Sequence, residues 1–518
     1  MCATRWSSLS ASTGLTLGLI AFVVLHSAGA GAEPPPTITF VEAIGRTLDR
    51  NPGVEIERQK IEQAAGSLQS ANGLFDWGSY ARAYNNITRL PIMVPNSPLL
   101  VQRTEELVTA VGVSRQFRSG VRVAPSFNLA RTEVLPGGTL PATRAEVGVT
   151  VTVPLLRGLG PNGLAANEAA ARSDLATMRH LSRHKIASQV AQSATAFWSC
   201  LAAQQTHDIL VDTERRAEAF MSIINRLVTG GELPSAVFAE ASADFLRRRS
   251  DRVSGALAVY FGRQQLGAAI GLDSAGMAEA PSAAGSFPNV IPMAPNPAGD
   301  AALVELALRR RGDYQAALTN RATAEVLRRK ALDDAKQRLD FDVRVGYSGL
   351  EDHPDRSRYL GAFTSNSTGA NLNTMLTLEW PFANNAARGE MMRRRALVRQ
   401  AELASAQLAT LVATEVQGAL QSLRTAIEQR DIALQTVAAL ELVVEDQRLK
   451  VTNGESSVTA LVQNEDRYFQ ARLALIQAVR AYALTLVDLR RVTGTLVEEA
   501  GDRHSVSTDA LLRPPTNS

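Results

Sequence analysis

Two short segments of this 518-residue chain have nearly the same sequence: VTGGE at residues 228–232 and VTNGE at residues 451–455, 223 positions apart. A further glycine follows forty residues after the last glycine of each segment, at Gly271 and Gly494. Two unrelated loops would not keep this spacing. The sequence therefore predicts an internal duplication, in which two halves form one architecture rather than a string of separate domains.

Each repeated segment closes a very long helical pattern. The patterns cover residues 162–227 and 384–451 and contain no proline, and the second spaces its apolar residues like a coiled coil. At 1.5 Å per residue, each helix would be roughly 100 Å long, about three times the thickness of a hydrocarbon core. Helices of this length do not fit an ordinary globule, so we expect them to project.

A second helical pattern follows each segment, at residues 234–271 and 456–494. Glycine supplies the positive φ that the C-terminus of a helix often needs. The two segments are therefore predicted to be the tips of two antiparallel helical hairpins, one in each half.

Strand-like segments precede both long helices. Residues 146–156, 340–348 and 373–382 alternate between apolar and polar side chains. This pattern is typical of a membrane β-barrel, and equally of a half-buried strand in a soluble sheet. The first half contains an additional strand-like hairpin around residues 107–131, with a turn at 118–120 and no counterpart in the second half.

The first residues have the features of a secretory signal peptide. Arg5 provides a positive charge, residues 15–25 are apolar, and small residues offer cleavage after Ala30 or Ala32. Eleven apolar residues are too few to span a bilayer, although an uncleaved anchor is the alternative. We therefore predict a signal peptide at residues 1–32 and an exported mature protein.

Cleavage would leave Cys200 as the only cysteine, which excludes an intramolecular disulfide and favours a helix-packing role. No later segment has the ~18–20 apolar residues of a spanning helix. If the mature chain enters a membrane, we therefore expect it to do so as a closed β-barrel, in which every backbone group is paired.

These observations divide the chain into five parts. We predict a signal peptide at 1–32, a first structural repeat at 37–272, a linker with five prolines at 273–300, a second repeat at 301–499, and a disordered C-terminal tail at 500–518.

The charge balance excludes a general attraction to nucleic acid, because 54 basic residues face 51 acidic ones. The basic runs at 247–249, 309–311 and 393–395 have acidic residues nearby, and we predict that they lie on solvated helix faces.

The sequence gives no sign of an enzyme or of a cofactor. It has no nucleophile elbow, P-loop or dinucleotide fingerprint in a suitable context. GLGPNG at residues 158–163 lacks a lysine for phosphate and is predicted to join a strand to a helix. His180 and His184 have a spacing that can hold a metal, but no nearby carboxylate or cysteine completes a site, so a solvated or inter-helix face is favoured.

Three stretches carry a family resemblance: ITFVEAIGRTLDRNPGV at residues 38–54, VTVPLLRGLGPNG at 151–163, and the tip with its return helix at 449–494. With the duplicated order of elements, they make residues 37–499 similar to the TolC-like outer membrane efflux proteins. The resemblance implies a mainly α fold with membrane β. Three identical chains would each give four strands to a shared twelve-stranded barrel in the outer membrane of a Gram-negative-type bacterium. A periplasmic barrel of long helices would continue it and taper at the tips.

The resemblance also implies a function without chemistry. The trimer would be the passive exit duct of a tripartite efflux system for small molecules or drugs, driven by an inner-membrane pump through a periplasmic adaptor, or membrane fusion, protein. The alternatives are the exit duct of a type I protein secretion system, a barrel that anchors envelope components, and a non-conducting periplasmic coiled-coil scaffold. The residues expected to contact the adaptor and form the entrance are Gly230, Gly231, Glu232, Glu240, Asn453, Gly454 and Glu455.

The chain departs from the family in two ways. Where characterised members narrow the entrance with aspartates beyond the tip glycine, it has Ala460 and Gln463 in one tip and Val237 and Glu240 in the other. Acidic residues near the tips are instead Glu232, Glu240, Glu455, Glu465 and Asp466. The additional hairpin does not fit the four-strand count.

Overall fold

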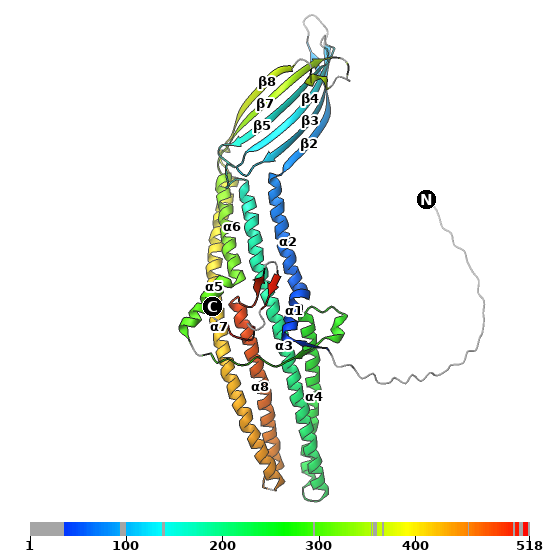
Figure 1. Ribbon diagram of the computed structural model, residues 1–518, viewed down its shortest axis with the longest axis vertical. Helices are drawn as coiled ribbons and strands as arrows, with labels where there is room; N and C mark the ends of the chain where they lie inside the picture. Colours follow the sequence, from blue (N-terminus) through cyan, green and yellow to red (C-terminus); the bar gives the residue numbers. More distant parts are fainter. Residues whose placement is uncertain are drawn as a thin grey trace, which may run out of the picture.

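The structure is a computed structural model that describes residues 36–93, 100–136, 140–293, 296–353, 355, 360–364, 367–453, 455–500, 503–506 and 511–515. The predicted signal peptide lies outside the described residues. The molecule is elongated, with a β-sheet at one end and two helical tips at the other (Figure 1).

Both halves contain two helices, then strands, then a helical hairpin, and the first half has two more strands than the second. The first half has α1 Phe40–Arg50, α2 Pro52–Asn72, β2 Trp77–Ile92, β3 Leu100–Gln116, β4 Arg122–Leu135, β5 Ala142–Pro154, α3 Ala165–Thr229 and α4 Ser235–Ala269. The second has α5 Pro297–Arg310, α6 Gly312–Asp334, β7 Arg338–Asp352, β8 Ser367–Glu379, α7 Asn385–Thr452 and α8 Val458–Val492. Short elements complete the list: β1 Thr37–Thr39, η1 Gly73–Phe75, η2 Gly276–Glu279, β6 Ser282–Ala284, η4 Gly361–Phe363, β9 Glu498–Ala500 and β10 Arg503–Ser505.

The long helices have the predicted length. α3 contains 65 residues and α7 contains 68, so each extends about 100 Å. Each forms an antiparallel hairpin with a 35-residue return helix, α4 or α8. We call α3–α4 the first hairpin and α7–α8 the second hairpin. None of the helices in the described part of the chain has the length and hydropathy of a membrane-spanning segment.

The main core lies at mid-length, where α1, α3, α8 and the end of α4 meet. Ile38, Phe40, Phe197 and Trp198 are almost completely buried there, and the Phe40 and Trp198 rings stack with centroids 4.7 Å apart. Cys200 is fully buried in the same core, and burial raises the pKa of its thiol above the ordinary value. The predicted packing role of this cysteine is confirmed.

Both return helices end in the same way. The Leu272 N–H donates to the Gly267 carbonyl at 3.0 Å, and the Thr495 N–H donates to the Arg490 carbonyl at 3.0 Å. This long bond around a residue with positive φ is the Schellman motif. The positive-φ residues are Gly271 and Gly494, with φ of 81° and 69°.

Each of these glycines abuts a helix break in its own half. A Cβ on Gly271 would lie 2.6 Å from the Arg50 carbonyl oxygen, at the break between α1 and α2, and one on Gly494 would lie 2.9 Å from the Arg311 nitrogen, between α5 and α6. The breaks, at Asn51 and Arg311, are 260 positions apart, whereas the return-helix ends are 223 apart. The first half is therefore 37 residues longer between α2 and the end of α4.

Those residues form a strand pair inside the sheet. The strand order is β2-β3-β4-β5-β7-β8, with every neighbouring pair antiparallel. The additional hairpin is thus confirmed as β3 and β4. The expectation of four strands per chain, which came from the resemblance, is wrong: the chain forms a six-stranded sheet.

The predicted tail is partly ordered. β9 and β10 form an antiparallel pair, and Leu511 is buried in the main core. The Arg490 guanidinium, itself buried, donates to the carbonyls of Arg513 at 2.7 Å and Pro514 at 3.4 Å. Burial lowers the pKa of Arg490 to about 10. The prediction of disorder is therefore wrong for residues 503–506, of which 503–505 pair with β9, and for 511–515, where the buried guanidinium needs carbonyls as acceptors.

The segment predicted as a linker also contains regular structure. β6 pairs in parallel with β1, so the segment returns to the start of the first half before α5 begins.

Candidate functional site

The two tips share the same backbone hydrogen bond. In the first, the Glu232 N–H donates to the Leu227 carbonyl at 2.9 Å around Gly231, which has a φ of 77°. In the second, the Glu455 N–H donates to the Lys450 carbonyl at 2.8 Å. Both tips are Schellman-type ends, so the repeated pentapeptide encodes a repeated turn.

The predicted tip residues lie where the sequence placed them. Those that the structure describes are all exposed at the end of the molecule opposite the sheet: Gly230, Gly231, Glu232, Glu240, Asn453 and Glu455 (Figure 1). Gly454 lies outside the described residues. Among the tip residues that the structure describes, only Glu240 makes a polar contact with the other hairpin, as its carboxylate accepts from Thr459 Oγ1 at 3.4 Å.

A row of polar contacts above the tips joins the two hairpins, and we call it the hairpin interface. Arg480 donates to Ser199 Oγ at 3.0 Å, Arg472 to Asp212 at 2.7 Å and Arg248 to Asp466 at 2.9 Å, followed by Thr459 to Glu240. Apolar packing of Ile209, Leu210 and Phe469 lies within the same interface. On α8 the contacts recur about every seven residues, so a single helix face carries them.

Arg248 is the most buried charged residue of the hairpin interface, with a side chain only 3 % exposed. Its guanidinium lies 3.4 Å from Asp244 on its own helix, 2.9 Å from Asp466 on the second hairpin, and 4.7 Å from the centre of the Phe469 ring. The neighbouring Arg247 also bridges both aspartates, at 2.9 and 3.2 Å. Two cations and two carboxylates thus fasten α4 to α8.

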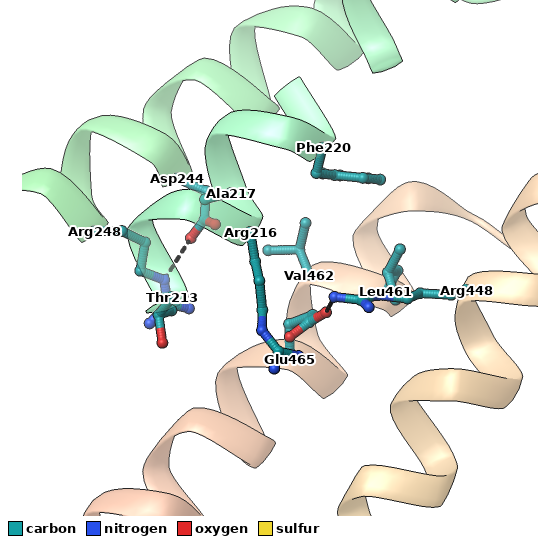
Figure 2. Close-up of a pocket in the computed structure, with 10 residues that line it drawn as sticks. All are labelled: Thr213, Arg216, Ala217, Phe220, Asp244, Arg248, Arg448, Leu461, Val462 and Glu465. Atoms are coloured by element: carbon teal, nitrogen blue, oxygen red, sulfur yellow. Dashed lines mark hydrogen bonds and ion pairs between the residues drawn. The ribbon is translucent and has the colours of Figure 1, made fainter. Parts of the chain in front are cut away.

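Figure 2 shows the space beside this cluster, a cavity of about 50 Å³ between the hairpins. Arg216 of α3 and Glu465 of α8 extend into it from opposite hairpins. Glu465 pairs with Arg448 of α7 at 2.6 Å, so its charge is already balanced within the second hairpin. The cavity is therefore a small gap between charged side chains of the hairpin interface, and it is too small for an organic ligand.

The sequence did not reveal this interface. The run at 247–249 was expected on a solvated helix face, and this is wrong for Arg248, although Arg249 is exposed. The same correction holds in the run at 309–311 for Arg311, which is buried against Asp313 and Glu415. The available signal is the seven-residue spacing of Thr459, Asp466, Leu473 and Arg480 in α8, which places these four residues on one face of the helix.

The histidine pair lies elsewhere, on α3 against the start of α6. His184 Nδ1 is 3.6 Å from Asp313, and burial is the main reason why the pKa of His184 falls below its ordinary value. A neutral histidine between two packed helices fits the inter-helix role favoured from the sequence.

The hairpin interface should hold across the physiological pH range. Burial alone would raise the pKa of Asp212, but the hydrogen bond from Arg472 and the charges of Arg216 and Arg472 lower it overall. A carboxylate with a lowered pKa in the folded protein stabilises the contact above its unfolded pKa of about 4, and this stabilisation is lost as the pH falls through the folded pKa.

Spin labels on exposed positions 232 and 455 would report the distance between the tips. We expect the same distance distribution from pH 5 to pH 8, and broadening only below about pH 4. Broadening between pH 7 and pH 5.5 would mean that a group other than Asp212 controls the interface.

No protein-family model matches this sequence, and no curated protein does. Solved structures match in fold. The CmeC outer membrane channel of Campylobacter jejuni has a TM-score of 0.65 and 14% identity, covering 88% of this chain and 85% of that one. VceC of Vibrio cholerae gives 0.63 and 13%, covering 88% and 96%. The open state of MtrE of Neisseria gonorrhoeae gives 0.61 and 15%, covering 88% and 88%.

Proposed function

This chain has the fold of the TolC-like outer membrane channels, and on that premise we propose that three copies form the outer membrane exit duct of a tripartite efflux system. The duct is passive and serves small molecules or drugs. Energy comes from an inner-membrane pump, and a periplasmic adaptor joins the pump to the helical tips. The sheet lies in the outer membrane of a Gram-negative-type bacterium, and the hairpins extend through the periplasm.

One observation carries this proposal: a single sheet with one apolar and one polar face stands at the end of helices about 100 Å long. The row Ala81, Val111, Phe127, Val147, Tyr347 and Ala370 follows the strand pairing across one face, which we call the apolar face. Val147 and Tyr347 are half exposed on it. η4 covers this face at Leu129 and Ala145, where Phe363 stacks on Phe127. The exposed apolar part of the face suits lipid, and a polar face behind it suits a lumen.

The hairpin interface supports a closed resting entrance. Its ion pairs hold the two hairpins of one chain together just above the tips, so parting them would widen the end of the duct. We propose that adaptor docking at the exposed tips shifts this equilibrium. Because Asp212 and Asp466 each pair with an arginine of the other hairpin, the closing contacts are ion pairs between hairpins rather than a ring of free aspartates.

Planar bilayers and whole cells test the proposal together. The purified protein should conduct ions, and its gene should restore drug resistance to a strain that lacks its own channel of this class. Conductance with restored secretion of a protein toxin but not of drugs would favour the type I secretion duct. A protein that fractionates with the periplasm and never conducts would be a scaffold, and the proposal would fail.

Replacing Gly231 with valine should weaken adaptor docking without unfolding the protein. Its φ is 77°, a conformation that β-branched residues rarely adopt, although a Cβ there would meet no atom within 4 Å. The substitution therefore distorts only the exposed tip. We expect at least a tenfold weaker adaptor affinity by surface plasmon resonance, which corresponds to about 1.4 kcal/mol.

Gly230→Ala is the matched control, because Gly230 has an ordinary φ of −74°. It should bind the adaptor nearly as well as the native protein. Equal losses in both variants would show that the side chain itself, rather than the turn conformation, disturbs docking.

A further inference from the structure

We infer that the β3–β4 hairpin widens the shared barrel to eighteen strands, and that the β2 and β8 edges of neighbouring copies close it. This inference rests on the proposed homotrimer and deepens it. It makes the membrane section a broad aqueous lumen rather than the narrowest part of the duct.

The hairpin is part of the wall and not a flap folded over it. β3 pairs with β2 along the full length of β2, from Trp77–Arg115 to Ile92–Leu100. On the other side, β4 pairs with β5 from Arg122–Thr152 to Thr132–Ala142. Each of the two strands therefore has a neighbour on both sides, as interior strands of a barrel do.

In the half of the sheet nearer the helices, the two faces continue through the hairpin, whereas Arg103, Glu105, Arg131 and Glu133 lie on the same side of the inserted strands toward the other end. On the apolar face, Val111 of β3 and Phe127 of β4 stand between Ala81 and Val147 in one row. Val111 is 47% exposed and Val147 is 50% exposed, so the inserted strand offers the same apolar surface as its neighbours. This alternation of apolar and polar side chains is expected of strands in a barrel wall, and not of a flap or a plug inside the lumen.

The opposite face is built from small and polar residues at the same level. Its row consists of Tyr80, Gly112, Ser126, Gly148, Gly346 and Asn371. Tyr80 lies over Gly112, where a Cβ would be 2.7 Å from the ring. Arg344 and Glu146 pair on the same face at 2.9 Å. Ser126, Gly148 and Gly346 add little volume on this side of the sheet.

The two edges fit a second copy of this chain. β2 has 16 residues and β8 has 13, and each pairs on one side only among the described residues. With six alternating strands, β2 and β8 run in opposite directions, so the β8 edge of one copy meets the β2 edge of the next as an antiparallel pair. Long unpaired edges are otherwise a liability, and head-to-tail closure of identical copies removes them.

Barrel width follows from the number of strands. Barrel diameter grows roughly linearly with strand number, so eighteen strands give a diameter about one and a half times that of twelve. Barrels of 16–18 strands leave an aqueous channel, as a general rule. Selection by size would then fall to the helical tips, where the hairpin interface lies.

Cysteine cross-linking and native mass together test the closure. In a Cys200→Ala background, cysteines are placed at 81, 83 or 85 on β2 and at 372, 374 or 376 on β8, all on the apolar face. At least one pair should oxidise to a covalent ring of three chains. The matched control moves the β8 cysteine to Asn373, which faces the other way, and should not cross-link.

Native mass of the detergent-extracted protein gives the number of copies, and three copies would mean eighteen strands. A closed covalent dimer would mean a twelve-stranded barrel and would overturn the inference. So would a complex of three chains in which no edge pair cross-links.

Polymer exclusion measures the width directly. Polyethylene glycols of graded size, added from the extracellular side, should enter and lower the conductance at sizes that a twelve-stranded channel excludes in the same bilayers. An identical cutoff would overturn the wide lumen. A wide, three-copy barrel that fails to restore efflux would instead contradict the proposed function and leave this inference standing.

Discussion

Replacing Arg248 with alanine is expected to raise the open probability of the proposed channel at least fivefold in planar bilayers. The substitution removes a buried cation and leaves Asp244 and Asp466 with Arg247 as their remaining partner. Losing one partner of a charged hydrogen bond costs about 1–3 kcal/mol, and Asp466 is 36% exposed, which favours the lower end. At 1–3 kcal/mol, the equilibrium between closed and open tips shifts about 5- to 150-fold.

Arg249→Ala is the matched control, since Arg249 is the next residue of the same run and is exposed. It should conduct like the native channel. A double-mutant cycle with Asp466→Ala separates the ion pair from general loss of packing, because only a direct interaction makes the two effects non-additive. If Arg248→Ala stays as closed as the native channel, the hairpin interface does not control the entrance.

Replacing Gly271 with alanine should give the largest loss of stability. A left-handed conformation costs a residue with a Cβ about 1–2 kcal/mol, and displacing packed atoms costs typically about 1–3 kcal/mol more. At Gly271 both costs apply, because φ is 81° and the Cβ would lie 2.6 Å from the Arg50 carbonyl oxygen. The total is about 2–5 kcal/mol.

Gly231→Ala isolates the conformational cost, since φ is similar there and the surroundings are open. Thermal unfolding followed by circular dichroism should therefore rank Gly271→Ala well below Gly231→Ala. Equal midpoints for the two variants would mean that the end of α4 does not pack tightly on the break between α1 and α2.

The features predicted from the sequence are those that neighbouring residues determine. The tips depend on hydrogen bonds between residues five apart, such as Glu232 to Leu227, so a local pattern reveals them. The alternation of residues 147–153 likewise describes a strand by itself, and the additional hairpin followed from the same signal.

The contacts that the sequence did not predict join residues far apart. Arg248 and Asp466 are separated by 218 positions, and nothing in the sequence near either residue shows that α4 and α8 pack together. The order in the tail depends in the same way on Arg490, which is buried only because α8 lies in the core. The strand count was wrong because it came from the resemblance, whereas the inserted hairpin was visible in the residues themselves.

The insertion consists of two strands, and this even number limits how the sheet can gain strands during evolution. Adding one strand would leave the chain at the end of the sheet away from the helices, where α3 could not begin beside α2 and α6. Adding a complete pair returns the chain to the end of the sheet from which it left, so β5 still leads to the start of α3. The turn between the two added strands lies at the helical end, where the Gly160 N–H donates to the Ser119 carbonyl at 3.0 Å and Arg118 pairs with Glu168 at 2.6 Å. The proposed barrel can therefore gain strands two at a time, while the helices keep their attachment to the same end of the sheet.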